Sequence, residues 1–322
     1  MGDGIKPVYS IVIPAYNEES VLAESYKRLT AVMSALETPY ELIFVNDGSL
    51  DTTADILDGM AGRDNCVKAL HFSRNFGHQA AISAGMDYAA GEAVVIIDAD
   101  LQDPPEVIPK MIEAWRAGSE VVYGKRLSRK GETVFKKLTA RMFYRVLRKV
   151  TNVDIPVDTG DFRLLDRKVV DTMKRISERN RFMRGLVAWV GFSQTPVEYV
   201  RDERFAGETK YPFRKMVKFA LDGITSFSYM PLRIATTLGA ALSALSFAYL
   251  IVIVCQALFT NTTIQGWAST VSIILISQGI IMMMLGMIGE YIGRIFDEIK
   301  GRPLYIVARS EGFDTNPILK DG

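Results

Sequence analysis

An acidic pair, Asp98 and Asp100, is the clearest candidate for chemistry in the sequence. Two carboxylates at positions i and i+2 of an extended segment project from the same side, so they can share one hard cation. Mg²⁺ or Mn²⁺ prefers such oxygen ligands and completes its coordination shell with phosphate oxygens and water. A cation held there would neutralise the charge that grows on a departing diphosphate. For an isolated D-x-D pattern, however, two solvated acids in a loop are the commoner interpretation.

The residues around the pair favour metal binding over a solvated loop. The apolar run Ala93-Val-Val-Ile-Ile97 precedes the pair, and Gln102, Asp103 and two prolines follow it. Polar residues also follow two earlier apolar runs. Among these, Asp47 could accept a hydrogen bond from a base or a ribose. Tyr16 could stack on a base, although ordinary surface packing is the alternative for that side chain.

The elements that must position these groups alternate along the chain. Runs rich in β-branched residues predict strands at 9–13, 41–45, 67–72, 93–97 and 120–123. Helical patterns lie between them, at 20–36, 52–61, 78–90 and 106–117. This order predicts βαβ units and an α/β domain with a mainly parallel sheet. In such sheets ligands bind outside the carboxyl ends of the strands, which is where the polar residues lie.

The sequence also disfavours several classes of binding site. No G-x-G-x-x-G follows the first predicted strand and no G-x-x-x-x-G-K-[ST] occurs, which argues against the dinucleotide-binding fold and the P-loop NTPases. Two histidines and two cysteines, widely scattered, disfavour a zinc site. A formal net charge of +1 leads us to expect no nucleic-acid partner. The cysteines predict no disulfide framework, and the N-terminus predicts no cleavable signal peptide.

An uncharged stretch without any Asp, Glu, Lys, Arg or His runs from Ile234 to Gly289. A membrane-spanning helix needs about 20 apolar residues. Two such helices fit, at 232–258 and 268–292, on either side of a polar turn at 259–266. A buried helical hairpin of a soluble protein is the alternative, but such a length of buried helix without a charge is rare. Basic residues flank the spans and predict that both termini are cytoplasmic, namely Arg214, Lys215, Lys218, Arg233, Arg294, Lys300 and Arg302.

A further helix is predicted just before the first span, because apolar residues recur there at helical spacing with basic residues on the other side. This pattern is typical of an amphipathic helix in the headgroup plane, with a helix packed on the soluble domain as the alternative. Gly289 and Gly293 form a G-x-x-x-G that would let helices approach closely in a homo-oligomer. The predicted organisation is a cytoplasmic domain (1–210), an amphipathic juxtamembrane helix (211–230), a two-helix transmembrane anchor (231–295) and a cytoplasmic C-terminal tail (296–322).

Several motifs in a fixed order resemble those of glycosyltransferase family 2. The motifs of the upstream domain are Pro14-Ala-Tyr-Asn-Glu-Glu19, Asn46-Asp-Gly-Ser49, Ser73-Arg-Asn-Phe-Gly77 and Asp98-Ala-Asp-Leu-Gln-Asp-Pro-Pro105. Downstream segments at 160–165, 181–185, 189–192 and 201–211, followed by two spans, are similar to the polyprenyl-phosphate glycosyltransferases. That group includes the bactoprenol glucosyltransferases and, more distantly, the dolichol-phosphate mannose synthases. The resemblance covers nearly the whole chain.

The resemblance implies a nucleotide-sugar-binding, Rossmann-like domain of the GT-A type. It implies inverting, metal-dependent transfer of one sugar to a polyprenyl phosphate, such as undecaprenyl phosphate, at the cytoplasmic face of the plasma membrane. UDP-glucose is the expected UDP-sugar donor and Mg²⁺ or Mn²⁺ the expected cofactor. The resemblance assigns the nucleotide to Pro14, Ala15, Tyr16, Glu18, Asp47, Asn75, Asp98 and Ala99. It assigns the metal to Asp98, Asp100 and Gln102, and the position usually described as the base to Asp161, with Asp158 as runner-up.

A phosphate acceptor changes what the enzyme must supply. A hydroxyl acceptor needs a general base, whereas a phosphate is already ionised and has to be aligned beside another anion. Whether Asp161 removes a proton or orients other groups is therefore open. Cations are needed in either case, and arginine suits phosphate because its contacts are bidentate. The candidates are Arg126, Arg129, Arg141, Arg201, Arg204 and Lys210, with solvated or headgroup-binding charges as the alternative for each.

Two rival interpretations remain open at this point. The first is an enzyme with a different donor, such as an aminoarabinose or mannose donor, acting on polyprenyl or dolichyl phosphate. The second is a non-catalytic membrane scaffold. Intact acidic motifs argue against the scaffold, because a domain without catalysis has no physical need for adjacent carboxylates at the edge of its sheet.

Overall fold

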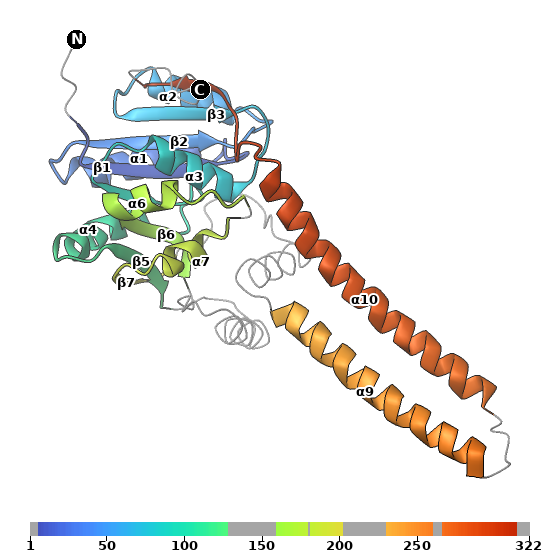
Figure 1. Ribbon diagram of the computed structural model, residues 1–322. Coiled ribbons are helices and arrows are strands. Elements are labelled where there is room, and N and C mark those ends of the chain that lie inside the picture. Colours follow the sequence, from blue (N-terminus) through green and yellow to red (C-terminus); the bar gives the residue numbers. More distant parts are fainter. Residues whose placement is uncertain (1–5, 128–158, 180, 202–229, 260–265, 314–322) are drawn as a thin grey trace.

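The computed structural model of the protein describes residues 6–127, 159–179, 181–201, 230–259 and 266–313. In this part of the chain one mixed sheet carries the strand order β7-β5-β6-β4-β1-β2-β3-β8 (Figure 1). The strands are β1 (Tyr9–Ala15), β2 (Tyr40–Asn46), β3 (Val67–Phe72), β4 (Ala93–Ile96), β5 (Val121–Arg126), β6 (Thr159–Asp166), β7 (Gln194–Tyr199) and β8 (Val307–Glu311). The pairs β1–β2, β1–β4, β2–β3 and β5–β7 are parallel, whereas β4–β6, β5–β6 and β3–β8 are antiparallel.

Helices cover both faces of the sheet, because alternate residues of each central strand point to opposite sides. Ile11 and Ile13 of β1 pack with α1 (Leu22–Ser34), α2 (Thr53–Ala61) and α4 (Ile108–Arg116) on one face. Val12 packs with α3 (His78–Tyr88), α6 (Arg167–Lys174) and α7 (Met183–Trp189) on the other. A short 3₁₀ helix, η1 (Pro105–Val107), leads into α4. The central strands are therefore buried on both faces, as the apolar runs in the sequence require.

The predicted α/β domain with a mostly parallel sheet is confirmed, and its early elements agree with the sequence to within a few residues. Three strands have no predicted counterpart. β6 and β7 carry polar residues among their apolar ones, and β8 is a five-residue edge strand with two charged side chains. Such short or half-polar strands lack the apolar periodicity from which strands are predicted. Of these, β8 lies within the stretch 296–322 that the sequence sets apart as a tail.

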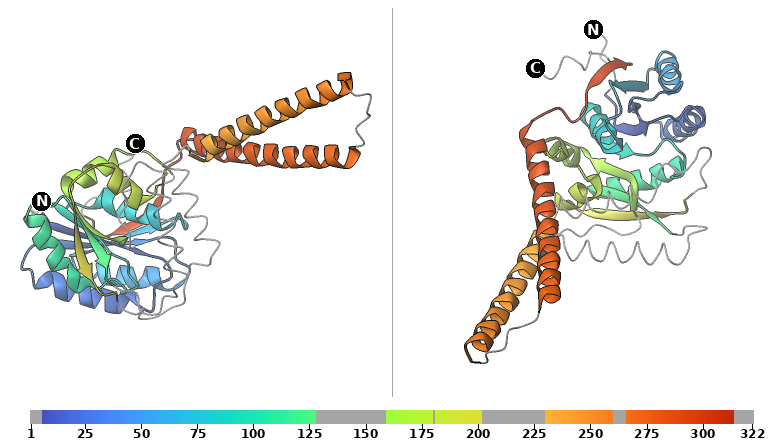
Figure 2. Two further views of the ribbon diagram at one scale, coloured as in Figure 1. Left: turned by 90° about the horizontal axis from the view of Figure 1, so that it is seen from below. Right: turned by 90° about the vertical axis from the view of Figure 1, so that its right-hand side faces the viewer.

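Two long helices, α9 (Met230–Phe259) and α10 (Trp267–Ile299), form a hairpin that extends away from the α/β domain (Figures 1 and 2). Their bounds lie close to those of the two predicted spans. Within the described residues, one segment, Ile276–Ile299 of α10, is long and apolar enough to cross a membrane by length and composition. The candidate segment is not buried in the protein. A membrane crossing by both helices stays a prediction, and the amphipathic helix expected at 211–230 lies, up to residue 229, outside the described residues.

Candidate active site

The loops that follow β1 and β2 are joined to each other at the carboxyl edge of the sheet. Asn17 donates its backbone N–H to Ser49 Oγ (2.9 Å) and accepts the Leu50 N–H on its side-chain oxygen (2.8 Å). Asn17 adopts a φ of 53°, in the left-handed region that asparagine tolerates better than most residues. Of the residues predicted to contact a nucleotide, Pro14 and Ala15 are buried in β1, while Tyr16 and Glu18 are half-buried beyond its end.

Asp47 connects the loop after β2 with the loop after β3. Its carboxylate accepts hydrogen bonds from the backbone N–H groups of Phe76 (2.6 Å) and Gly77 (2.9 Å). Burial raises the pKa of Asp47, and these two amides partly offset the effect. Gly48 has a φ of 65°, and a Cβ there would collide with the backbone of Arg74 and Asn75. Asp47 thus holds the segment that contains Asn75 in place, and a contact of either residue with a nucleotide stays a prediction.

Asp98 follows β4 and has three other acidic side chains near it. Its Oδ1 is buried and has no hydrogen bond among the described residues, and the Nε2 of His78 is 3.4 Å away. Burial raises the pKa of Asp98 to about 6, and Asp161, Asp103 and Asp100 push it in the same direction against the opposing effect of His78. An ionised Asp98 therefore lacks a fully matching positive charge in the described part of the chain.

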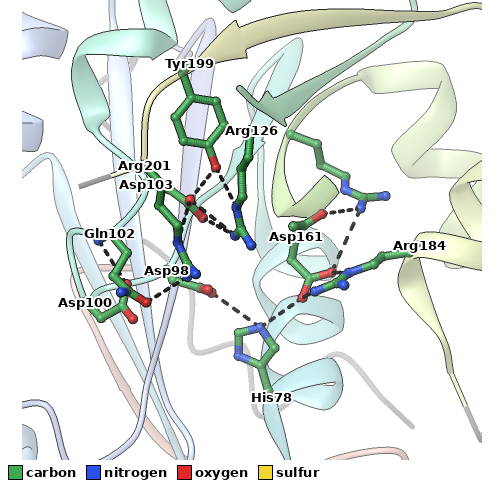
Figure 3. Close-up of polar contacts among 12 residues, drawn as sticks. His78, Asp98, Asp100, Gln102, Asp103, Arg126, Asp161, Arg184, Tyr199 and Arg201 are labelled. Atoms are coloured by element: carbon green, nitrogen blue, oxygen red, sulfur yellow. Dashed lines mark hydrogen bonds and ion pairs between the residues drawn. The ribbon is translucent and has the colours of Figure 1, made fainter. Parts of the chain in front are cut away.

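The residues after Asp98 form a tight turn. Leu101 is buried and adopts a φ of 59°, a conformation that is strained for a leucine and is typical of functional loops. Asp100 Oδ1 accepts the N–H of Gln102 (3.1 Å), and Gln102 Oε1 accepts a hydrogen bond from Arg201 (2.7 Å). The side chain of Gln102 is thus directed to Arg201 (Figure 3), and its predicted role as a metal ligand stays untested.

The acidic pair fits a divalent cation in its donor chemistry. The described residues contain no group of three or more His, Cys, Asp or Glu side chains arranged to hold a metal. Mg²⁺, however, is commonly bound through one or two carboxylates, with substrate phosphates and water supplying the remaining ligands. Asp98 and Asp100 supply hard oxygen donors, and the buried Oδ1 of Asp98 lacks a hydrogen-bond partner within the described ranges.

Asp161, on β6, is held by cations. Arg184 of α7 forks onto both carboxylate oxygens at 3.0 and 3.1 Å, and His78 approaches one of them at 3.6 Å (Figure 3). Although burial acts in the opposite direction, Arg184 and His78 hold the pKa of Asp161 well below its usual range. Burial alone would lower the pKa of His78, but Asp98 and Asp161 raise it to about 9. His78 therefore bridges the two acidic positions as a cation.

Asp103, beside the acidic pair, is a second carboxylate that we call saturated, because its oxygens, like those of Asp161, already contact cations or hydrogen-bond donors. Asp103 is 1% exposed and accepts a hydrogen bond from the Tyr199 hydroxyl. Arg126 approaches both of its oxygens at 3.3 Å, and the Nε of Arg201 lies 3.7 Å from one of them. Gly160 leaves space for the Arg126 guanidinium, since a Cβ there would collide with it. The structure thus brings together Arg126 and Arg201, two of the predicted acceptor-binding cations, from β5 and the segment after β7.

Two family models match the chain. The model described as "Glycosyl transferase family 2" matches residues 10–173, and that described as "GtrB C-terminal hairpin" matches residues 230–295. The chain is a member of glycosyltransferase family 2. It is therefore a glycosyltransferase, and its domain has the GT-A-like α/β fold that the sequence predicts.

Named relatives of this family 2 glycosyltransferase span almost its whole length. An uncharacterised glycosyltransferase of Bacillus subtilis is 58% identical and the alignment covers 97% of each chain. A prophage-derived bactoprenol glucosyl transferase of Shigella flexneri is 42% identical over 94% of this chain and 97% of its own. A prophage bactoprenol glucosyl transferase homologue of Escherichia coli is 43% identical over 93% of this chain and 98% of its own.

A solved structure of glucosyl-3-phosphoglycerate synthase from Mycobacterium tuberculosis, with Mn²⁺, UDP-glucose and phosphoglyceric acid, is 21% identical with a TM-score of 0.45. The match covers 67% of this glycosyltransferase and 76% of the synthase. That similarity is too low to say anything about the ligands of this chain.

The folded chain also brings to this site residues that the sequence did not single out. His78, Arg184 and Tyr199 carry the contacts of Asp161 and Asp103, and each is brought in from a distant part of the chain. The only available signal was position, since His78 directly follows the Ser73–Gly77 motif and Arg184 lies within the 181–185 motif. Other predicted site residues lie outside the described residues, namely Arg129, Arg141, Asp158, Arg204 and Lys210.

Proposed function

We propose that this glycosyltransferase moves one sugar, glucose from UDP-glucose, to a polyprenyl phosphate such as undecaprenyl phosphate, with inversion and with a divalent metal. The observation that carries the proposal is that Asp98, whose buried Oδ1 has no hydrogen bond among the described residues, lies in one cluster with Asp103 and the two cations that Asp103 holds, Arg126 and Arg201 (Figure 3). A metal-held diphosphate and a phosphate acceptor need these two kinds of group side by side. The full-length bactoprenol glucosyl transferase relatives support the same acceptor class.

The donor would lie over the carboxyl ends of β1, β2 and β4. Asp98 and Asp100 would hold Mg²⁺ or Mn²⁺, which as a Lewis acid stabilises the negative charge of the leaving nucleoside diphosphate. Tyr16 and Glu18 are half-buried at the same edge and would contact the nucleotide. The rigid connections of Asn17 with Ser49 and of Asp47 with the loop after β3 preorganise this surface.

The acceptor phosphate would approach Arg126 and Arg201. Burial lowers the pKa of Arg201, and its Nε is buried without a hydrogen bond within the described ranges. Asp103 already faces both guanidinium groups, so it orients them before a phosphate arrives. Charge-assisted bonds from arginine to phosphate are among the stronger hydrogen bonds in proteins, and they also fix the direction from which the phosphate oxygen attacks.

Asp161 would orient cations in this reaction and would not act as a base. Both of its oxygens are taken by Arg184, and its pKa lies well below the usual range, so it is a poor proton acceptor. An ionised phosphate acceptor has no proton that must be removed before attack. Arg184 and His78, held by Asp161, would instead contribute positive charge near the reacting phosphates.

The reaction would take place at the cytoplasmic face of the plasma membrane, with α9 and α10 crossing the bilayer. Large apolar side chains on both helices are exposed, among them Phe247 at 65% and Met282 at 67%, and a lipid environment would cover them. Retention of the full chain in membranes after alkaline carbonate extraction is expected, whereas release into the supernatant would contradict a spanning hairpin.

A donor panel tests the proposed reaction. Full-length protein in detergent is incubated with undecaprenyl phosphate and radiolabelled UDP-glucose, UDP-aminoarabinose, other UDP-sugars or GDP-mannose, and lipid-soluble label is counted. We expect label from UDP-glucose only, and none with the Asp98→Ala variant. Transfer from another donor would replace glucose with that sugar and keep the reaction class. Absence of transfer from every donor, with a folded protein, would favour the non-catalytic scaffold.

A further inference from the structure

The edge of the catalytic sheet is closed by a part of the chain that follows the hairpin. β8, the red strand near β3 in Figure 1, pairs antiparallel with β3. His71 lies opposite Arg309, and Leu70 lies opposite Ser310. β3 otherwise would present an unpaired strand edge next to β2 and the loop that carries Asp47. The C-terminal strand therefore belongs to the sheet that builds the donor side of the site.

Specific contacts dock this strand. The Tyr305 ring stacks on Phe72 with centroids 5.2 Å apart, and its hydroxyl donates to Asp87 (2.8 Å). Gly312, at a φ of 78°, passes so close to β3 that a Cβ would collide with the carbonyl of Val67. The segment is thus fitted to β3 and is more than a polar edge cover.

The hairpin end of the segment is clamped as well. Arg179, just after α6, donates from its guanidinium to the carbonyl oxygens of Asp297 (3.0 Å) and Pro303 (3.2 Å). Its backbone N–H donates to the Glu298 carboxylate (2.8 Å). A cation at the C-terminal end of a helix also interacts favourably with the helix dipole. Arg179 therefore fixes the end of α10 against the α/β domain.

A chain of polar side chains runs from β8 to the donor loop. Arg309 Nη1 lies 2.5 Å from Asp58 Oδ2, and Asp58 Oδ1 lies 3.0 Å from His71 Nε2. His71 Nδ1 lies 3.1 Å from the side-chain nitrogen of Asn46, and the side-chain oxygen of Asn46 accepts the Ser49 N–H (2.9 Å).

The direction of these contacts is set by their chemistry. The Asn46 amide nitrogen can only donate, so His71 Nδ1 accepts and its proton sits on Nε2, facing Asp58. His71 is 4% exposed, and its contact with Asp58 is an electrostatic one that lacks good hydrogen-bond alignment. The orientation of the Asn46 amide and the tautomer of His71 are thus fixed, and the charges of Asp58 and Arg309 extend the contact to β8.

We propose that β8 is a positioning element for the donor site, acting through Arg309, Asp58 and His71 on the loop Asn46–Ser49. The loop is held in its binding conformation only while the segment that returns from the hairpin is docked on β3. The assignment of this loop to the donor rests on the proposed function, whereas its mechanical connection to β8 does not.

The test uses full-length protein in detergent and two readouts. Arg309→Gln and Asp58→Asn, both at partly exposed positions, break the chain. We expect each to weaken UDP binding about fivefold or more, as is usual for coupled sites, while the KM for lipid phosphate changes little. We also expect faster hydrogen exchange in the segment 46–50. The double variant should bind UDP no more weakly than the single variant with the lower UDP affinity. Arg309→Lys keeps the positive charge and should therefore bind UDP with nearly the wild-type affinity, unlike Arg309→Gln.

Lys168→Gln is the matched control, because it breaks a 2.6 Å ion pair between Lys168 on α6 and Glu120, just before β5, away from these polar side chains. It should change neither readout. Unchanged UDP affinity and unchanged exchange at 46–50 in Arg309→Gln, even with a lower melting temperature, would overturn the proposal and leave β8 a purely structural edge. If the wild type binds no UDP, the proposed donor is wrong, and the exchange comparison alone still decides the role of β8.

Discussion

Two acidic residues of the same site, Asp98 and Asp161, have opposite electrostatic environments. Asp98 has a buried oxygen without a hydrogen-bond partner among the described residues and a pKa raised to about 6. Asp161 has both oxygens engaged by Arg184 and a pKa well below its usual range. The first is a carboxylate that still needs positive charge, and the second is a carboxylate whose charge is already balanced. The difference suits one for a ligand cation and the other for holding side chains.

Burial affects both carboxylates, so the difference between their pKa values comes from the charged groups around each of them. Removing a carboxylate from water disfavours its ionised form unless cations or hydrogen bonds compensate. Arg184 and His78 provide that compensation at Asp161, while Asp98 has other acids around it and shares His78 with Asp161. Asp103 follows the pattern of Asp161, with Arg126 and Tyr199 as its partners. Two saturated carboxylates, Asp161 and Asp103, therefore lie near the unsaturated Asp98 in the described part of the site.

Removing the unsaturated position should have the largest effect. Asp98→Ala or Asp100→Ala is expected to lower sugar transfer to background, because the leaving diphosphate would lose its counter-charge. EDTA should do the same to the wild type, with recovery on adding Mg²⁺ or Mn²⁺, measured by label in the lipid fraction. Glu106→Gln is the control and should stay active, because Glu106 is an exposed acid of the following helix η1 and pairs with Arg28. Full activity in EDTA would contradict the proposal that Asp98 holds a metal ion.

A double-mutant cycle tests the role of Asp161 and its partner Arg184. Asp161→Asn and Arg184→Gln are each expected to lower kcat by about a factor of 10², because a misplaced cation costs that much in alignment. The double variant should be no slower than the slower single one. If Asp161 were a base, its loss would dominate and the Arg184 variant would be much milder. Near-normal turnover of Asp161→Asn would remove the residue from the mechanism altogether.

The cations beside Asp103 should affect the acceptor more than the donor. Arg201→Gln is expected to raise the KM for polyprenyl phosphate about tenfold, the usual cost of one charge-assisted hydrogen bond. The KM for the nucleotide-sugar should change little. Lys125→Gln is the matched control, since Lys125 adjoins Arg126 but forms an exposed ion pair with Glu198. A larger effect on the donor KM than on the acceptor KM would contradict the assignment of Arg201.

The smallest expected effect is that of removing the Tyr199 hydroxyl, which contacts Asp103. Tyr199→Phe removes the hydroxyl that donates to Asp103 and accepts from Arg126. The loss should lower the free energy of unfolding by about 1–3 kcal/mol, the cost of leaving a buried acceptor unpaired. Thermal unfolding in detergent measures it, and kcat should fall far less than in Asp161→Asn. An unchanged melting temperature would show that Arg126 and Arg201 balance Asp103 without the hydroxyl.

The sequence by itself predicted the central strands, the helical hairpin and the acidic pair. These features are local, since an apolar run of strand length, an uncharged stretch of helix length and two acids after a strand are all visible within a short window. The carboxyl-end rule then placed Asn46–Ser49 and Asp98–Asp100 at one edge without coordinates.

The tertiary structure alone decided which acids are balanced and what closes the sheet. Arg184 is 23 residues from Asp161 in the chain, Tyr199 is 96 from Asp103, and Arg309 is 251 from Asp58. No local pattern predicts such pairs, because they form only when helices and strands pack. The acidic pair was readable as a candidate metal site, but its contrast with Asp161 depends on where distant cations come to rest, which is a property of the folded chain.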